Sequence, residues 1–140
     1  MTIIESIREF MLQCPYLKDM VPVNVDYLGT DEIAYTIDGV PSVPVLQKYV
    51  DGSSLKQFNF VFGSLEYYGA DHVQNIANSK VYENIELWFV KMTHEEKLPN
   101  LGDNRTAVFI ETVSSGYMFG ATADTARYQI QARLVYYEEE

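Results

Sequence analysis

Residues 126–137, ARYQIQARLVYY, show the most regular alternation of side chains in this 140-residue chain. Apolar or aromatic side chains take every second position from Tyr128 to Tyr136, and arginine or glutamine fills most of the positions between them. Successive side chains of a strand point to opposite faces. This period of two therefore predicts an antiparallel strand with one face on the core and the other in water.

A hairpin is predicted at residues 45–64, VLQKYVDGSSLKQFNFVFGS, because Asp51-Gly52 is a strong turn signal between two strand-like runs. On the second run Phe58, Phe60 and Phe62 share one face, and we expect them to form the core of a sheet. An exposed aromatic ladder that stacks bases is the alternative. The acidic charge of the chain disfavours that alternative.

Shorter strands are expected on both sides of this hairpin. Residues 21–50 have the character of strands and turns, and Pro41 and Pro44 would interrupt any regular ladder there, which indicates an edge or a loop. Residues 108–113 alternate again. The following Ser114-Ser115-Gly116 predicts a turn into another short strand.

The first helix is predicted over residues 2–14. Thr2 and Glu5 have the spacing of a capping box, and apolar side chains then recur every three or four residues. Pro15 ends this helix, because a proline pushes its predecessor out of the helical region.

Residues 71–97 keep helical spacing and predict a second, longer helix. Asn78-Ser79 leaves open a division into two helices, since both side chains compete for backbone hydrogen bonds. Leu87 and Val90 widen the apolar face beyond one stripe. Such a helix is either deeply embedded or also touches a neighbour, and we expect the sheet to be its main partner.

The order of elements is helix, strands, hairpin, helix, strands. Segregated helices and strands indicate an α+β fold, a mainly antiparallel sheet with an N-terminal helix and a second long helix packed on it. The length fits a single domain over residues 1–140.

Composition excludes several classes of function. Ten Lys and Arg face twenty Asp and Glu, which gives a net charge of -10 and disfavours nucleic-acid binding through phosphates. The single cysteine, Cys14, cannot form an internal disulfide. No apolar run approaches the roughly 20 residues of a membrane span, and the N-terminus has no signal-peptide pattern. We therefore expect a soluble cytoplasmic protein.

Patterns that carry chemistry are missing from the sequence. His72 and His94 stand outside any metal-ligand motif, and the serine pairs lack a G-x-S-x-G context. Cys14 falls on the apolar face of the first helix, where a thiolate is disfavoured. No glycine-rich phosphate loop occurs. We predict a protein that is not an enzyme and has no catalytic residue, cofactor or metal.

Four segments of the chain resemble a family of small structural proteins of long-tailed bacteriophages and prophages of Gram-positive bacteria. Members are called minor capsid or tail-completion (tail-terminator) proteins. The segments that carry the resemblance are TIIESIREFMLQCPYL at 2–17, KYVDGSSLKQFNFVF at 48–62, VQNIANSKVYENIELW at 73–88 and DTARYQIQARLVYY at 124–137.

The resemblance implies an assembly function in the virion. Such proteins form a ring, commonly a hexamer, that caps the tail tube and docks the head connector, and DNA passes through the ring without specific binding. It implies assembly in the host bacterial cytoplasm with copies of itself, the tail tube protein and the head-completion proteins as partners. Some of the acidity would line the passage or meet basic partners. The alternatives are a head-completion (connector-adaptor) protein on the other side of the same joint, and a small ligand-binding domain.

Six residues are candidates for the protein–protein interface. Aromatic side chains are enriched at such interfaces, and arginines on the wet face of residues 126–137 would meet an acidic neighbour. The alternative for the arginines is a plain solvated sheet face. The candidates are Tyr49, Asp51, Tyr67, Tyr68, Arg127 and Arg133.

Overall fold

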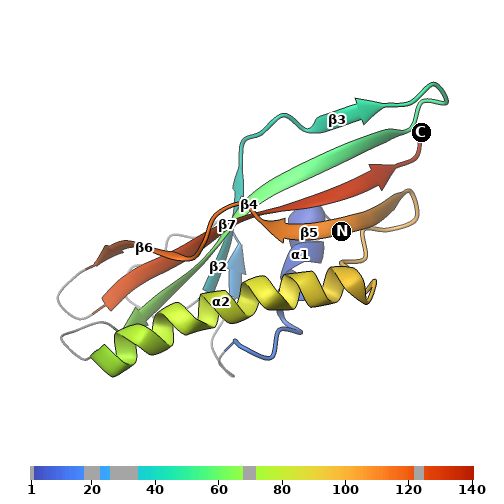
Figure 1. Cartoon of the computed structure of the whole chain (residues 1–140). Helices are drawn as coiled ribbons and strands as arrows, with labels where there is room; N and C mark the ends of the chain where they lie inside the picture. The colour runs from blue at the N-terminus through green and yellow to red at the C-terminus, as the bar shows by residue number, and fades with distance from the viewer. Residues whose placement is uncertain (1, 18–22, 26–34, 68–71, 122–124) are drawn as a thin grey trace.

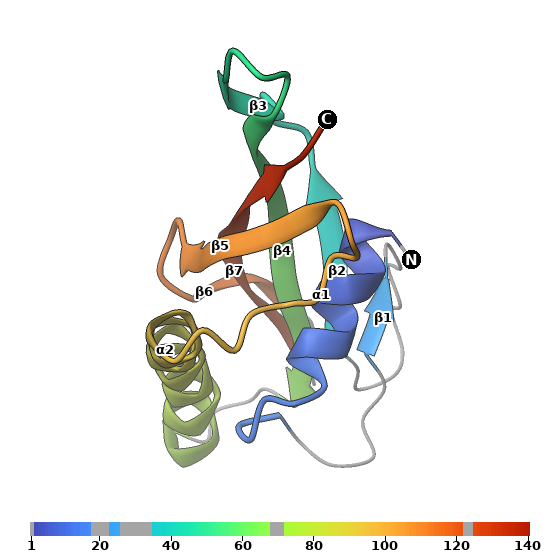
Figure 2. The same cartoon turned by 90° about the vertical axis from the view of Figure 1, so that its right-hand side faces the viewer.

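A computed structural model describes residues 2–17, 23–25, 35–67, 72–121 and 125–140. For residues 66–67, 72–79, 118–121 and 125–126 it describes the backbone only. Seven strands form one sheet, and two helices cover one side of it, as Figures 1 and 2 show. The predicted α+β fold with a mainly antiparallel sheet is confirmed. The elements are α1 (Ile3–Met11), β1 (Val23–Val25), β2 (Tyr35–Val40), β3 (Val45–Lys48), β4 (Ser54–Tyr67), α2 (His72–His94), β5 (Arg105–Thr112), β6 (Tyr117–Ala121) and β7 (Thr125–Glu138).

The centre of the sheet is the pair of its longest strands, β4 and β7. They are antiparallel over 14 residues each, from Ser54 opposite Glu138 to Tyr67 opposite Thr125. In this register Phe60 and Phe62 lie opposite Ala132 and Ile130, and all four are at most 1% exposed. Phe58 packs against the same core. The prediction that the phenylalanines form core is confirmed.

The two flanking strands are each built from two pieces. β2 and β3 lie along the same edge of β4, separated by the segment from Pro41 to Pro44, as expected of prolines that interrupt a ladder. β5 and β6 both run antiparallel to β7. The short strand expected after Ser114-Ser115-Gly116 is β6, but the chain does not reverse direction at 114–116. The edge is irregular there, and the amides of Val113 and Ser114 both donate to the Gln131 carbonyl.

Helix α1 begins where the capping signal predicts. The Thr2 hydroxyl accepts from the Glu5 amide at 3.2 Å, and the helix ends at Met11, earlier than the expected residue 14. Its buried side packs on the sheet and on α2, with the Phe10 ring 4.6 Å from that of Trp88. The two helices therefore lie on the same face of the sheet.

Helix α2 is continuous across Asn78-Ser79, so the division into two helices does not occur. Near the end of the helix, the Thr93 hydroxyl accepts from the Ile110 amide and donates to the Ile110 carbonyl, both at 3.2 Å. These two bonds give hydrogen-bond partners to backbone groups of β5. The sheet is a partner of α2, as expected, but Leu87 and Val90 remain 68% and 66% exposed. The added apolar width of this helix therefore faces water.

Candidate functional site

The hairpin between β3 and β4 projects beyond the body of the molecule (Figure 1). Its turn is closed by two backbone bonds, from the Tyr49 amide to Ser53 (2.9 Å) and from the Gly52 amide to Tyr49 (3.1 Å). Gly52 has a φ of 93°, a conformation that glycine adopts without strain. The turn of this hairpin is therefore well defined.

Asp51, a predicted interface residue, holds this turn in shape. Its carboxylate accepts from the Ser53 amide at 3.0 Å and from the Ser53 hydroxyl at 2.5 Å. These hydrogen bonds lower the pKa of Asp51, the side-chain bond contributing most. One role of Asp51 is thus to fix the backbone of the apex.

Four apolar side chains are exposed on the hairpin, beside the exposed Gln47, Lys48 and Asp51. The hairpin patch, as we call it, consists of Val43, Leu46, Tyr49 and Val50, which are 70%, 43%, 40% and fully exposed, respectively. Gly, Pro, Asn, Asp and Ser dominate turns, so a valine at the apex runs against local preference. Sequence reasoning singled out Tyr49 but missed Val50. The signal for it was a β-branched residue directly before the Asp-Gly turn.

Tyr49 is only partly available to a partner. Its ring lies 6.3 Å from that of Tyr137 at the end of β7, in a tilted arrangement. Tyr67 and Tyr68 were predicted with it. Tyr68 and the side chain of Tyr67 lie outside the described residues, so the structure brings only Tyr49 and Asp51 together among these four.

Arg127 lies on the solvent face of the sheet and is paired within the chain. Its Nη2 donates to Asp38 Oδ2 at 2.9 Å, and its Nε donates to Gln129 Oε1 at 3.2 Å. The guanidinium also lies against Gly63, where an added Cβ would be 3.0 Å from Nη2. Gly63 on β4 thus leaves room for the guanidinium of Arg127, which extends from β7.

Arg133 has partners on both neighbouring strands. Its Nε donates to Glu111 Oε1 at 2.6 Å and its Nη1 to Gln57 Oε1 at 3.1 Å, while the guanidinium lies 5.5 Å from the centre of the Phe109 ring. An acidic neighbour for these arginines stays a prediction. Both already have carboxylate partners in their own chain.

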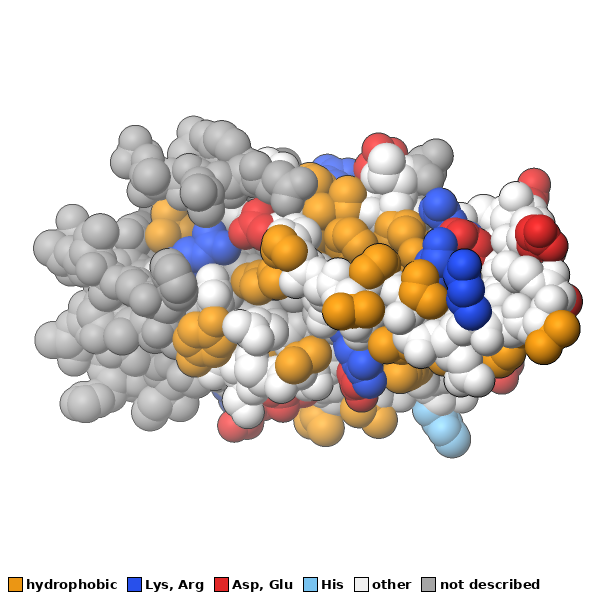
Figure 3. Space-filling model, turned by 90° about the horizontal axis from the view of Figure 1, so that it is seen from above, with side chains coloured by type: hydrophobic (Ala, Val, Ile, Leu, Met, Phe, Trp, Pro, Cys, Tyr) orange, Lys and Arg blue, Asp and Glu red, His pale blue; other side chains and the backbone are white. Residues whose placement is uncertain are grey.

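Acidic groups gather at the end where the hairpin and the C-terminus meet. Glu138 bridges Lys56 (2.7 Å) and Arg105 (2.9 Å), and hydrogen bonds from these two cations lower its pKa. Beyond this bridge, Glu140 lies against Gly52 at the hairpin. Figure 3, seen from the side away from α2, shows acidic side chains at this end and apolar ones along the middle.

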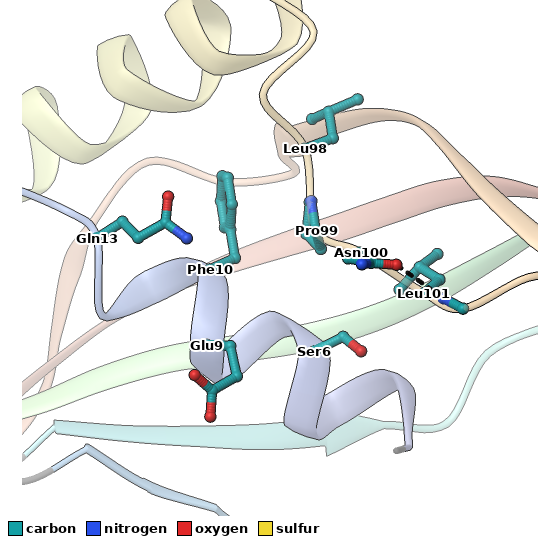
Figure 4. A pocket seen from close by; sticks show the side chains of 9 residues that line it. Ser6, Glu9, Phe10, Gln13, Leu98, Pro99, Asn100 and Leu101 are labelled. Carbon is teal, nitrogen blue, oxygen red and sulfur yellow. Dashed lines mark hydrogen bonds between the residues drawn. The ribbon is translucent and has the colours of Figure 1, made fainter.

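A pocket of about 370 Å³ lies between α1 and residues 98–102. Figure 4 shows its lining, in which Phe10, Pro99 and Leu101 supply apolar surface and Glu9 and Gln13 lie on the α1 side. Glu9 is the one carboxylate among its lining residues, and no histidine lines it. Such a lining offers neither an acid–base pair nor a ligand set for a metal. Sequence reasoning missed this pocket, because its walls come from segments about 90 residues apart.

In the part of the chain that the structure describes, the remaining reactive or metal-binding side chains form no site. Among the described residues, no three His, Cys, Asp or Glu side chains are grouped as metal ligands. His94 is exposed near the end of α2. Cys14 is buried, and desolvation raises its pKa to about 11, which keeps the thiol protonated at neutral pH.

The chain was compared with models of protein families and with curated proteins. No family model and no curated protein matches it. In the part of the chain that the structure describes, neither helix combines the length and the apolar character that a membrane crossing requires.

Proposed function

We propose that this chain is a virion assembly protein of a long-tailed phage or prophage. In this role it caps the tail tube and forms the head–tail joining ring. The observation that carries the proposal is the projecting hairpin, whose apex exposes Val50 completely. The exposed apolar side chains of the hairpin patch support the proposal, because an assembly protein requires a surface that binds its partners.

The resemblance of four segments to tail-completion proteins supports the same class. In this role the chain binds copies of itself, in a ring that is commonly a hexamer, together with the tail tube protein and the head-completion proteins. DNA passes through the ring without specific binding, which suits a chain with a net charge of -10. No step of this function requires catalysis.

A capping experiment tests the proposal. The purified chain is mixed with tail tubes assembled from the tube protein of the same phage, and the tubes are imaged by negative-stain electron microscopy. We expect a ring-shaped density at one end of each tube and no further growth from that end. Tubes that keep growing from both ends, with the chain left unbound, would refute the proposal.

A further inference from the structure

Helix α2 exposes apolar side chains on the side that faces away from its own sheet. We propose that this side of α2 pairs with the same side of α2 in a second copy of the chain, with the two helices antiparallel. A contact between two identical surfaces closes after two copies and builds no ring. The inference is therefore independent of the proposed function.

Exposed residues spaced four, three and four positions apart form one stripe along α2. The α2 strip, as we call it, consists of Glu83, Leu87, Val90 and His94. Ile85, Phe89 and Met92 are buried on the opposite side of the helix. In Figure 2 α2 is seen end-on at one corner of the molecule, with the rest of the described chain to one side of it. A second copy can therefore reach the α2 strip.

The centre of the α2 strip is apolar. Leu87 and Val90 are 68% and 66% exposed. Apolar side chains at alternating steps of three and four residues are those through which two helices pack side by side. In a two-fold pair centred between these two residues, Leu87 of each copy lies opposite Val90 of the other. The four side chains then shield one another from water.

The polar ends of the α2 strip favour a second copy as the partner. Glu83 and His94 are equally far from the centre of the strip, so the same two-fold axis places Glu83 of each copy opposite His94 of the other. An imidazole donates a hydrogen bond to a carboxylate in either protonation state, and a protonated imidazole also attracts it by charge. Neither side chain forms an ion pair with another described residue. Parallel pairing would instead bring the two Glu83 carboxylates together, and like charges repel.

Charges on this side of α2 are balanced, although the whole chain has a net charge of -10. From residue 80 to residue 94, Lys80 and Lys91 offset Glu83 and Glu86. Lys91 is 68% exposed, and its contact with Glu95 is long, at 4.0 Å. Two identical acidic surfaces would repel each other. Two copies of α2 can therefore approach each other without that repulsion.

Cysteine cross-linking tests both the pairing and its direction. Glu83→Cys and His94→Cys chains are mixed and oxidised, and the linked peptides are identified by mass spectrometry. We expect a disulfide between the two introduced cysteines, one from each chain, while the natural Glu83–His94 contact is kept at the other end of the pair. Two Glu83→Cys chains should not link to each other, because antiparallel pairing separates equal positions by about 16 Å along the helix. The buried Cys14 stays unreactive.

Val50→Cys is the control for random collision, because Val50 is fully exposed and lies on the hairpin, outside the α2 strip. It should give no link with His94→Cys chains. A link of equal yield from this control would contradict the pairing. Links between equal positions, with none between positions 83 and 94, would contradict the antiparallel direction.

Sedimentation of the full chain measures affinity. Val90→Ser should weaken the pair by about a hundredfold, because each pair loses two buried valines and each valine contributes about tenfold in affinity. Val43→Ser, 70% exposed on the hairpin, is the matched control and should leave the affinity unchanged. Glu83→Lys should weaken the pair, and adding His94→Glu should restore it. A chain that stays monomeric at every concentration, or equal effects of Val90→Ser and Val43→Ser, would overturn the inference.

The outcomes separate this inference from the proposed function. If the chain caps tail tubes but Glu83→Cys and His94→Cys chains do not link, the pairing of α2 is wrong and the proposed function stands. If these chains link but no tube is capped, the pairing stands and the proposed function is wrong.

Discussion

Arg127 on β7 donates a hydrogen bond to Asp38 on β2 at 2.9 Å, and the two side chains are only 19% and 23% exposed. The pair crosses β4 above Gly63, which has no side chain to obstruct it. Thr36 also donates to the same Asp38 oxygen at 3.1 Å. An arginine expected at a subunit interface is thus part of the bonding within one sheet.

Asp38→Asn tests the energy of this pair. Removing the charge leaves a half-buried guanidinium without its counter-ion, and we expect a loss of about 1–2 kcal/mol in the free energy of unfolding, measured in urea. Glu111→Gln is the matched control, since the Arg133–Glu111 pair is more exposed at 31% and 47% and should cost under about 1 kcal/mol. Equal losses would show that burial of the first pair has no effect.

Glu138→Gln should alter the pH dependence of stability. Hydrogen bonds from Lys56 and Arg105 hold the folded-state pKa of Glu138 below its usual 4.5. The stabilisation is therefore fully present above pH 4.5 and is lost as the pH falls through the folded-state pKa. Urea unfolding should show a loss of about 1 kcal/mol at neutral pH that shrinks in acid. A difference that stays constant with pH would disprove the ionic origin.

Tyr82→Phe should expose the cost of an unsatisfied buried hydroxyl. The Tyr82 hydroxyl lies 2.5 Å from that of Ser64 and donates to the Tyr128 carbonyl at 3.0 Å. Without it, the buried Ser64 hydroxyl loses its acceptor, and we expect a loss of about 1–3 kcal/mol in thermal or urea unfolding. The double variant Tyr82→Phe, Ser64→Ala should lose less free energy of unfolding than the sum of the losses of the two single variants. Additive losses would mean that the two hydroxyls are not coupled.

Glu96→Gly should stabilise the protein. Glu96 has a φ of 59°, and the next amide, Lys97, closes the end of α2 by donating to Met92 at 2.9 Å. A side chain in this left-handed conformation costs roughly 1–2 kcal/mol, which glycine avoids. We expect a gain of up to about 1 kcal/mol in the free energy of unfolding. Glu96→Ala keeps a Cβ and should give no such gain. A gain of the same size from alanine would assign the effect to charge.

The central strands could be predicted because their signals are local. The alternation around Ile130 and the Asp51-Gly52 turn define two strands and the face that each buries. Helix α2 shows where local signals fail. Asn78 and Ser79 are weak helix formers, but propensity is overridden when the rest of the helix packs into the core.

The candidate site was only partly predictable. Tyr49 and Asp51 are marked by their place at a strong turn, and both belong to the projecting hairpin. The partner of Arg127 lies 89 residues away, and the two walls of the α1 pocket are similarly distant. Such contacts depend on how the strands and helices are arranged in space, and a local sequence pattern does not contain that information.

Electron microscopy of particles assembled without this chain tests the central claim most directly. Host cells carrying the phage or prophage with the coding region deleted are induced, and the lysate is imaged. A tail-capping role predicts tails of excessive and variable length that are not joined to heads. Tails of normal length beside filled heads that leak DNA would contradict it and would place the chain on the head side of the joint.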